Sequence, residues 1–204
     1  MINNKRMQIT PWLRIWIRPK ATIRSLIEEG STRTPLLLAI FWGILVSLNI
    51  LNYVWITHPG QSIYKNPVFV GMMLLLGILK GIIILYLGSW LYLCTGKWIR
   101  GEGKFSDLKC ASGWSLYPFS IALMINLIVT GMGNHYGMGL FLQLVHLAVL
   151  IWALIIFFKL IGEAHHFSAW KGVITVVMAI ILLMIVGIVI VFLIPLLKPL
   201  FVTH

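Results

Sequence analysis

The chain has 204 residues, of which 60% are hydrophobic and 10% are charged, and its formal net charge is +11 at pH 7. A mean hydropathy of +0.97 excludes a soluble globular domain, in which about a quarter of the residues are charged. The positive charge does not indicate nucleic acid binding, because the basic residues flank long apolar runs. Attraction to anionic lipid, worth about 1 kcal/mol per basic residue, accounts for such a distribution.

The first 34 residues are polar and basic, and we expect this N-terminal segment to contain an amphipathic helix at the membrane interface. Thr10 followed by Pro11 is a helix start signal, and Pro19 repeats it. Tryptophan and isoleucine recur at helical spacing between basic residues, which is typical of helices lying in the interface plane. The residues expected to contact lipid or a partner are Trp12, Arg14, Trp16, Arg18 and Arg24. A lipid anchor and a docking site for a partner protein both stay open.

Five long apolar runs follow, and each approaches the ~20 residues with which a helix crosses a bilayer core of ~30 Å. The runs cover residues 35–56, 68–94, 114–130, 139–158 and 173–194. We therefore expect an all-α polytopic membrane protein with five transmembrane helices. The five spans form a membrane domain over residues 35–194, and residues 195–204 form a short external tail.

Lysine and arginine are distributed unequally over the segments that flank these runs. Residues 1–34 hold seven, the loop after the second run holds four and the loop after the fourth holds two. The segments on the other side hold only Lys65 and Lys198. Because loops rich in lysine and arginine remain in the cytoplasm, the asymmetry predicts a cytoplasmic N-terminus and an external C-terminus. We expect anionic lipids of the inner leaflet to surround the basic segments.

Lys80 is the one formal charge within an apolar run, where a lysine costs about 2.5–3.5 kcal/mol. Gly77 and Gly81 form a small-xxx-small pattern beside it, which favours close packing against another helix. Polar residues in the outer halves of other runs are expected to form an intramembrane cluster around Lys80, namely Asn49, Asn52, Asn126, Gln143 and His146. Helix–helix hydrogen bonding, outward snorkelling of Lys80 and a cavity for a solute or lipid headgroup all stay open.

The two loops on the basic side share Phe-Ser and a lysine at an offset of 62 residues, preceded by a Gly-Glu pair that matches after a one-residue gap. This arrangement suggests a parallel repeat of helical hairpins, and convergence of two helix starts on the same capping residues is the alternative. We expect Ser106 and Ser168 to cap the helices that follow, and the two glutamates to pair with nearby lysines. The loop residues expected to form a partner or lipid interface are Glu102, Phe105, Lys109, Glu163, Phe167, Trp170 and Lys171.

Three stretches together resemble the bacterial type of the Yip family, the Ypt-interacting membrane proteins. They are Pro-Trp-Leu-Arg-Ile-Trp-Ile-Arg-Pro-Lys-Ala-Thr-Ile-Arg at 11–24, Gly-Glu-Gly-Lys-Phe-Ser-Asp-Leu-Lys at 101–109 and Gly-Glu-Ala-His-His-Phe-Ser-Ala-Trp-Lys at 162–171. The resemblance covers residues 11 to about 194. It implies a five-span, non-enzymatic protein of a bacterial cell membrane. Eukaryotic members contact Rab-type GTPases in vesicle traffic and some bacterial members are associated with ABC-type transporters, so the resemblance also implies a protein partner.

Catalytic and cofactor chemistry is not indicated by the sequence. Glu163, His165 and His166 are ligand types for zinc, but their spacing fits no metal motif. The glycine-rich stretch at 101–104 lacks the upstream glycine and the hydroxyl residue of a phosphate-binding loop. We therefore expect no enzyme activity, no metal or other cofactor and no nucleic acid partner.

The function that we expect is that of an accessory or scaffold protein for a membrane complex in transport or trafficking, acting through its cytoplasmic loops. The alternative is a small transporter, or a carrier of lipid or solute, that uses the cluster around Lys80.

Overall fold

A computed structural model describes residues 10–30, 33–58, 60, 66–131 and 138–201 of the chain. These residues form seven α-helices and no strand, which confirms the predicted all-α class. The helices are α1 Pro11–Ile17, α2 Pro19–Glu28, α3 Arg33–Thr57, α4 Pro67–Trp98, α5 Phe105–Gly131, α6 Met138–Ala164 and α7 Ala169–Phe201.

Helices α3 to α7 are each long and apolar enough to cross a bilayer, and each contains one of the five predicted runs. The shortest, α3, has 25 residues, which is about 37 Å at 1.5 Å per residue and exceeds a core of ~30 Å. Helix α5 continues through Pro118, as transmembrane helices do where neighbouring helices satisfy the freed backbone groups. The protein is therefore a multi-pass membrane protein.

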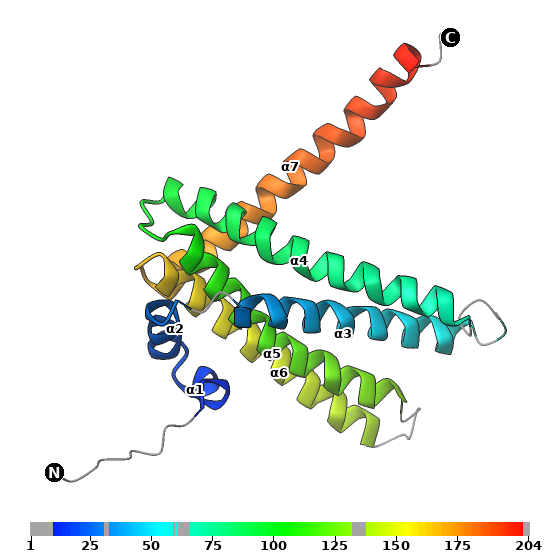
Figure 1. Cartoon of the computed structure of the whole chain (residues 1–204), viewed down its shortest axis with the longest axis horizontal. Helices are drawn as coiled ribbons and strands as arrows, with labels where there is room; N and C mark the ends of the chain where they lie inside the picture. The colour runs from blue at the N-terminus through cyan, green and yellow to red at the C-terminus, as the bar shows by residue number, and fades with distance from the viewer. Residues whose placement is uncertain (1–9, 31–32, 59, 61–65, 132–137, 202–204) are drawn as a thin grey trace.

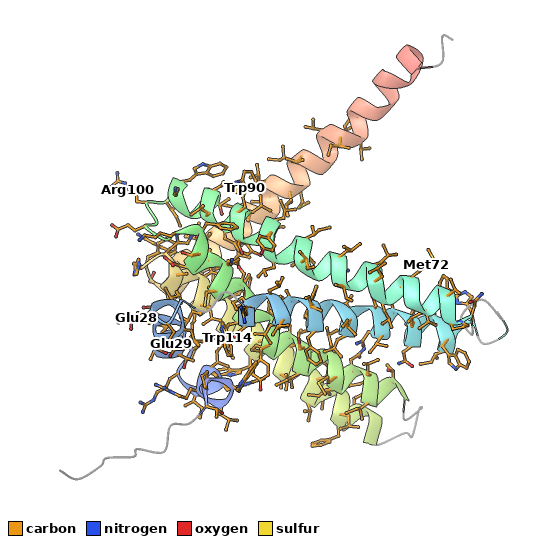
Figure 2. The ribbon with its side chains drawn as sticks, viewed as in Figure 1. Glu28, Glu29, Met72, Trp90, Arg100 and Trp114 are labelled. Carbon is orange, nitrogen blue, oxygen red and sulfur yellow. The ribbon has the colours of Figure 1, made fainter. Side chains whose placement is uncertain are left out.

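The short helices α1 and α2 lie at one end of the bundle, beside the α4–α5 and α6–α7 connections (Figure 1). We name this region the charged end and define it by residues 10–30, 96–109 and 160–171. In Figure 2, Glu28, Glu29 and Arg100 lie at this end, whereas Met72 lies toward the opposite one. The charged end is thus the place where the chain gathers its short helices and its acidic residues.

Small residues hold α3 and α4 in close contact. A Cβ atom added to Gly43 would overlap the carbonyl oxygen of Gly77, and one added to Gly81 would overlap that of Ala39. The Ser47 hydroxyl donates across the same contact to the carbonyl oxygen of Met73 at 2.8 Å. The small-xxx-small pattern around Lys80 therefore packs α4 against α3, by the close backbone approach that drives helix association in lipid.

Helix α7 contacts the bundle only along its first part and then diverges from it (Figure 1). Thr95 of α4 donates a hydrogen bond to the carbonyl oxygen of Thr175 at 3.0 Å, and Val176 and Ala179 are buried nearby. From Ile180 to Phe192 the large apolar side chains of α7 are exposed, except for the half-buried Leu182. In a membrane protein, lipid is the natural environment for these side chains.

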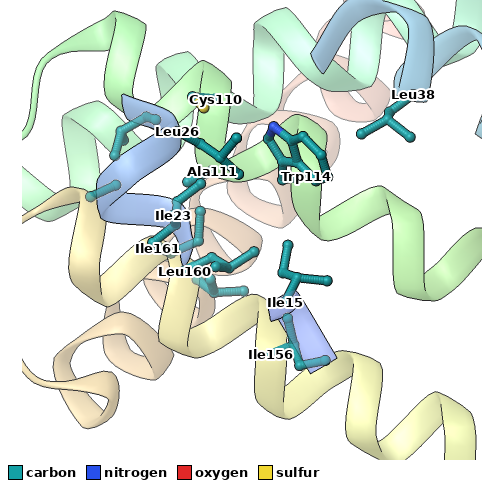
Figure 3. Packing of buried hydrophobic residues seen from close by; sticks show 13 residues of the cluster. Ile15, Ile23, Leu26, Leu38, Cys110, Ala111, Trp114, Ile156, Leu160 and Ile161 are labelled. Atoms are coloured by element: carbon teal, nitrogen blue, oxygen red, sulfur yellow. The ribbon is translucent and has the colours of Figure 1, made fainter. Parts of the chain in front are cut away.

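The main hydrophobic core lies at the charged end (Figure 3). Ile15 of α1 and Ile23 of α2 are fully buried there, together with Leu108 of α5 and Leu160 of α6. The N-terminal helices thus contribute to the protein core, although their sequence predicts a segment on the membrane surface.

Candidate interaction surface at the charged end

Helix α1 packs its apolar side on α5 and α6. Ile15 is fully buried, and the ring of Trp12 lies 4.8 Å from that of Trp114, centroid to centroid. The indole nitrogen of Trp152 donates a hydrogen bond to the carbonyl oxygen of Trp16 at 3.2 Å. The tryptophan face expected to meet lipid or a partner is therefore turned largely toward the bundle.

Helix α2 is fixed to the end of α6 by an ion pair. Glu163 is nearly buried and accepts hydrogen bonds from the Nε of Arg24, at 3.0 Å, and from its Nη2. This hydrogen bond and the attraction between the charges raise the pKa of the Arg24 guanidinium. The expectation that Glu163 pairs with a loop lysine is thus wrong. The N-terminal segment supplies the partner.

The opposite side of the N-terminal segment remains exposed. It presents two apolar side chains, Leu13 and Ile17, together with the basic side chains of Arg14, Arg18 and Lys20. Exposed apolar and basic residues on one surface are what an anionic membrane or an acidic partner binds. The predicted contact residues therefore divide into two sets. Trp12, Trp16 and Arg24 join the segment to the bundle, whereas Arg14 and Arg18 are free to bind another molecule.

The start of α5 is capped differently from the sequence expectation. Ser106 lies inside the helix, at its second position, and is not the capping residue. Asp107 instead accepts from the backbone nitrogen of Lys104 at 3.2 Å and from the Ser106 hydroxyl at 3.0 Å. A carboxylate at the third helical position commonly satisfies the first amide in this way. Glu102 lies exposed in the preceding loop.

Phe105 and Lys109 both turn toward Tyr86 of α4. The rings of Phe105 and Tyr86 are 6.4 Å apart, and the Nζ of Lys109 lies 5.6 Å from the centre of the Tyr86 ring. Phe105, which the sequence predicts to form a partner or lipid interface, thus contacts α4. A lysine over an aromatic ring is held by a cation–π interaction, so Lys109 contributes to the α4–α5 contact.

The loop between α6 and α7 presents a mixed surface. Phe167 stacks on His165 with ring centroids 5.0 Å apart, and the Nζ of Lys171 lies 5.8 Å from the Phe167 ring. Ser168 directly precedes α7, in the capping position that the sequence predicts. Trp170 is 72% exposed and is available to lipid or a partner.

The two copies of the Gly-Glu pattern have different structures. Glu163 ends a helix and is paired, whereas Glu102 lies in a loop and is exposed. Ser168 precedes its helix, whereas Ser106 is inside one. The two loops therefore have different roles, and the duplication of the hairpins stays a prediction from the sequence.

His165 connects the two loops at the centre of the charged end. Its side chain is buried, and its Nε2 lies 2.9 Å from the carbonyl oxygen of Tyr92, to which it donates. Glycines at 96, 101 and 103 surround the imidazole, and a Cβ atom at any of them would overlap it or its immediate surroundings. Burial lowers the pKa of His165, so the ring is held neutral with its proton on Nε2. The backbone nitrogen of Glu102 donates to the carbonyl oxygen of His165 at 3.3 Å, which joins the loops directly.

Sequence reasoning considered His165 only as a metal ligand and missed its structural role. A signal was present in Gly96, Gly101 and Gly103, since glycines crowded into a short connection often mark a close approach of backbone to another group. The distant residue that fills this space was not apparent from the sequence.

In the half of the bundle away from the charged end, polar side chains join α3 to α5. The amide nitrogen of Asn126 donates to the side-chain oxygen of Asn49 at 2.7 Å, and Asn49 donates to the carbonyl oxygen of Leu123 at 3.2 Å. One turn further, Asn52 donates to the hydroxyl of Thr130. These bonds are helix–helix contacts of the kind that contribute about 0.6 kcal/mol each in membranes.

The described residues do not form the expected cluster around Lys80. Lys80 is exposed on α4, beside the glycines that contact α3, and Gln143 is exposed on α6. His146 is half-buried on α6, and among the described residues no hydrogen bond links it to Lys80. The asparagines bond to one another and to the backbone across the α3–α5 contact, whereas the glycines beside Lys80 pack against α3.

Comparison with known proteins gives one family match. A family model described as the Yip1 domain matches residues 13–191, which is most of the chain. No curated protein matches the chain. No solved structure matches it either.

Proposed function

This chain belongs to the Yip1 domain family, and we propose that it is a non-enzymatic accessory or scaffold protein of a membrane complex in transport or trafficking. The observation that carries the proposal is the construction of the charged end. Ile15 and Ile23 are buried in the bundle, so the N-terminal segment has a fixed position. Its outer side, with Arg14 and Arg18, is exposed. A rigidly held, exposed basic surface is suited to binding another molecule.

The charge and composition of this surface favour two kinds of contact. Arg14, Arg18 and Lys20 would bind anionic lipid headgroups or acidic residues of a partner, while Leu13 and Ile17 would insert into an apolar layer. Since both features lie on one side of a docked segment, we propose that a membrane partner binds where the bundle meets the inner leaflet. An ABC-type transporter is the partner class that the family resemblance suggests.

The proposed orientation places the charged end in the cytoplasm of a bacterial cell. In a chain without its native cysteines, Glu102→Cys tests the loop of the charged end and Gly60→Cys tests the opposite end; both positions are exposed. A membrane-impermeant maleimide added to intact cells should label only the Gly60→Cys chain. Labelling of Glu102→Cys alone would reverse the orientation.

The partner proposal is tested by purifying the intact protein from its native membrane and identifying the chains that accompany it. The double variant Arg14→Glu and Arg18→Glu should lose the partner, because it reverses the exposed charges and leaves Ile15 and Ile23 buried. Lys65→Glu, a charge reversal in the loop predicted to be external, is the control and should retain it. If the double variant retains every accompanying chain, the exposed basic surface does not bind the partner.

The carrier alternative receives no comparable support. Lys80 is exposed and lies outside the Asn49–Asn126 contact, so the polar groups that would bind a solute do not converge on it. Lys80→Met is therefore expected to leave partner binding unchanged.

A further inference from the structure

A cavity of about 210 Å³ lies between α3, α4, α5 and α6. Its walls are mostly apolar and aromatic, with Trp42, Tyr92, Phe119 and Phe157 among them. Ile84 also lines it and is 37% exposed, so the cavity opens beside this residue on the outside of the bundle. All of these residues belong to helices of membrane-spanning length, and the opening therefore faces lipid.

The cavity arises where the neighbours of α4 change. Gly81 of α4 packs against α3, whereas Thr95, four turns further, packs against α7. Between these two contacts, Leu85 and Tyr92 face the cavity. The space is thus a consequence of the way α3 and α7 diverge along α4.

One serine hydroxyl in the cavity wall has no hydrogen-bond partner among the described residues, although other buried serine hydroxyls have one. Ser89, Ser115 and Ser120 are buried, and each donates to a carbonyl oxygen of its own helix. Ser112 is also buried and lines the cavity, but its hydroxyl has no hydrogen-bond partner among the described residues. A buried hydroxyl without a partner is costly, and an acceptor on a bound molecule would remove the cost.

The depth of Ser112 indicates what that acceptor is. Ser112 lies seven residues after the start of α5, about 10 Å along the helix, and the apolar run of α5 begins two residues later. This is the level at which the hydrocarbon core meets the headgroup region, where the ester groups of glycerolipids lie. Leu116 and Phe119, about one and two turns deeper, extend the wall into the hydrocarbon core.

We propose that this cavity binds one acyl chain of a membrane glycerolipid, whose ester carbonyl accepts a hydrogen bond from Ser112. The volume agrees with a chain segment, since a cavity of ~150 Å³ with apolar walls already binds benzene and a site for a drug-sized molecule needs ~300 Å³ or more. The headgroup lies outside the bundle at the level of Ser112, and the far end of the acyl chain continues past Ile84 into the hydrocarbon core. The bound lipid becomes a structural part of the α4–α5–α6 contact.

The test uses the full chain in nanodiscs of phosphatidylcholine with a small fraction of phosphatidylcholine that carries a diazirine in one acyl chain. After irradiation, adducts are mapped by mass spectrometry and should concentrate on the peptides of Ile84 to Tyr92 and Ser112 to Phe119. Ile84→Trp fills the opening and should lower these adducts by about tenfold, which corresponds to about 1.4 kcal/mol. Ile83→Trp is the control, because Ile83 is 57% exposed and does not line the cavity.

The role of the hydroxyl is tested by competition between ester-linked and ether-linked phosphatidylcholine. The wild-type chain should prefer the ester lipid by about two- to tenfold, as one hydrogen bond allows, and Ser112→Ala should lose the preference without losing thermal stability. Adducts spread evenly over the exposed faces, or equal labelling of Ile84→Trp and Ile83→Trp, would overturn the proposed site. An equal preference for the ester lipid in the wild-type chain and in Ser112→Ala would overturn the proposed hydrogen bond from Ser112 to the ester carbonyl.

Discussion

The charged end and the outer half of α7 are both rich in apolar residues, yet they are built in opposite ways. At the charged end, Ile15, Ile23 and Leu160 are fully buried in a cluster of side chains from six helices. Beyond Ala179, α7 diverges from the bundle (Figure 1), and its large side chains up to Phe192 are exposed except for the half-buried Leu182. Hydropathy alone does not separate the two regions, because lipid is as apolar as leucine. Close packing and specific polar contacts do separate them, and they mark the charged end as the region with a defined surface.

Adding one methyl group to each region is expected to give the largest difference in stability between them. Gly96→Ala would place a Cβ atom on the His165 ring, whereas nothing lies within 4 Å of the position where Gly187→Ala would add one. We expect Gly96→Ala to destabilise the protein by about 1–3 kcal/mol or more through overpacking. Gly187→Ala should leave stability level or raise it by up to about 1 kcal/mol through helix propensity. Thermal unfolding of both variants in one detergent measures the difference, and equal shifts would contradict it.

A smaller effect is expected from removing the charge of Glu163. Glu163→Gln keeps the shape of the side chain but loses the ion pair with Arg24, so the N-terminal segment should detach more often. Trypsin should then cleave after Lys20 several-fold faster than in the wild-type chain. Glu102→Gln, which changes the exposed glutamate of the other loop, should cleave at the wild-type rate. Similar rates in all three proteins would mean that the ion pair does not hold the segment.

The smallest effect concerns the pH dependence of stability. Burial lowers the folded-state pKa of His165 below the ordinary value of about 6.5, and the positive charges of His166 and Lys97 act in the same direction. Below pH ~6.5 the unfolded chain therefore binds the proton first, and stability falls as the pH falls. The melting temperature of the wild-type chain should drop between pH 7.5 and 5.5, and His165→Gln should flatten this dependence.

His166→Asn is the matched control for this measurement. His166 is exposed and has a φ of 60°, a conformation that asparagine tolerates. The variant should keep most of the pH dependence of the wild-type chain, because burial and not the charge of His166 is the largest cause of the lowered pKa of His165. A dependence that survives in His165→Gln would assign the effect to another group.

The features that depend on local pattern were predictable from the sequence. Apolar run length identified the five membrane helices, and the spacing of Gly77 and Gly81 identified a packing face. Capping at Ser106 was predicted wrongly because Asp107, one residue later, provides a stronger acceptor for the first amide. Rules that consider one helix at a time thus predicted the membrane helices and a packing face, but not the residue that caps α5.

The contacts that define the candidate site join distant parts of the chain. Arg24 and Glu163 are 139 residues apart, and His165 meets glycines of a loop more than sixty residues before it. The sequence contains several basic residues that could pair with Glu163 and several glycines that could leave space for the His165 ring. Which of them meet these side chains depends on the arrangement of the helices. The same reason explains Lys80, which lies exposed on α4 beside the α3–α4 contact and not within it.

The central claim is that the N-terminal segment is docked on the bundle with one side buried and the other exposed. It is tested most directly by the reactivity of single cysteines in a chain whose Cys94 and Cys110 are replaced by serine. Ile17 is 73% exposed and Ile23 is fully buried, and both belong to this segment. In open membrane fragments, a water-soluble maleimide should label Ile17→Cys quickly and Ile23→Cys only slowly, with faster labelling of Ile23→Cys once Glu163→Gln is added. Equal and rapid labelling of both positions in the chain with Glu163 intact would contradict the account.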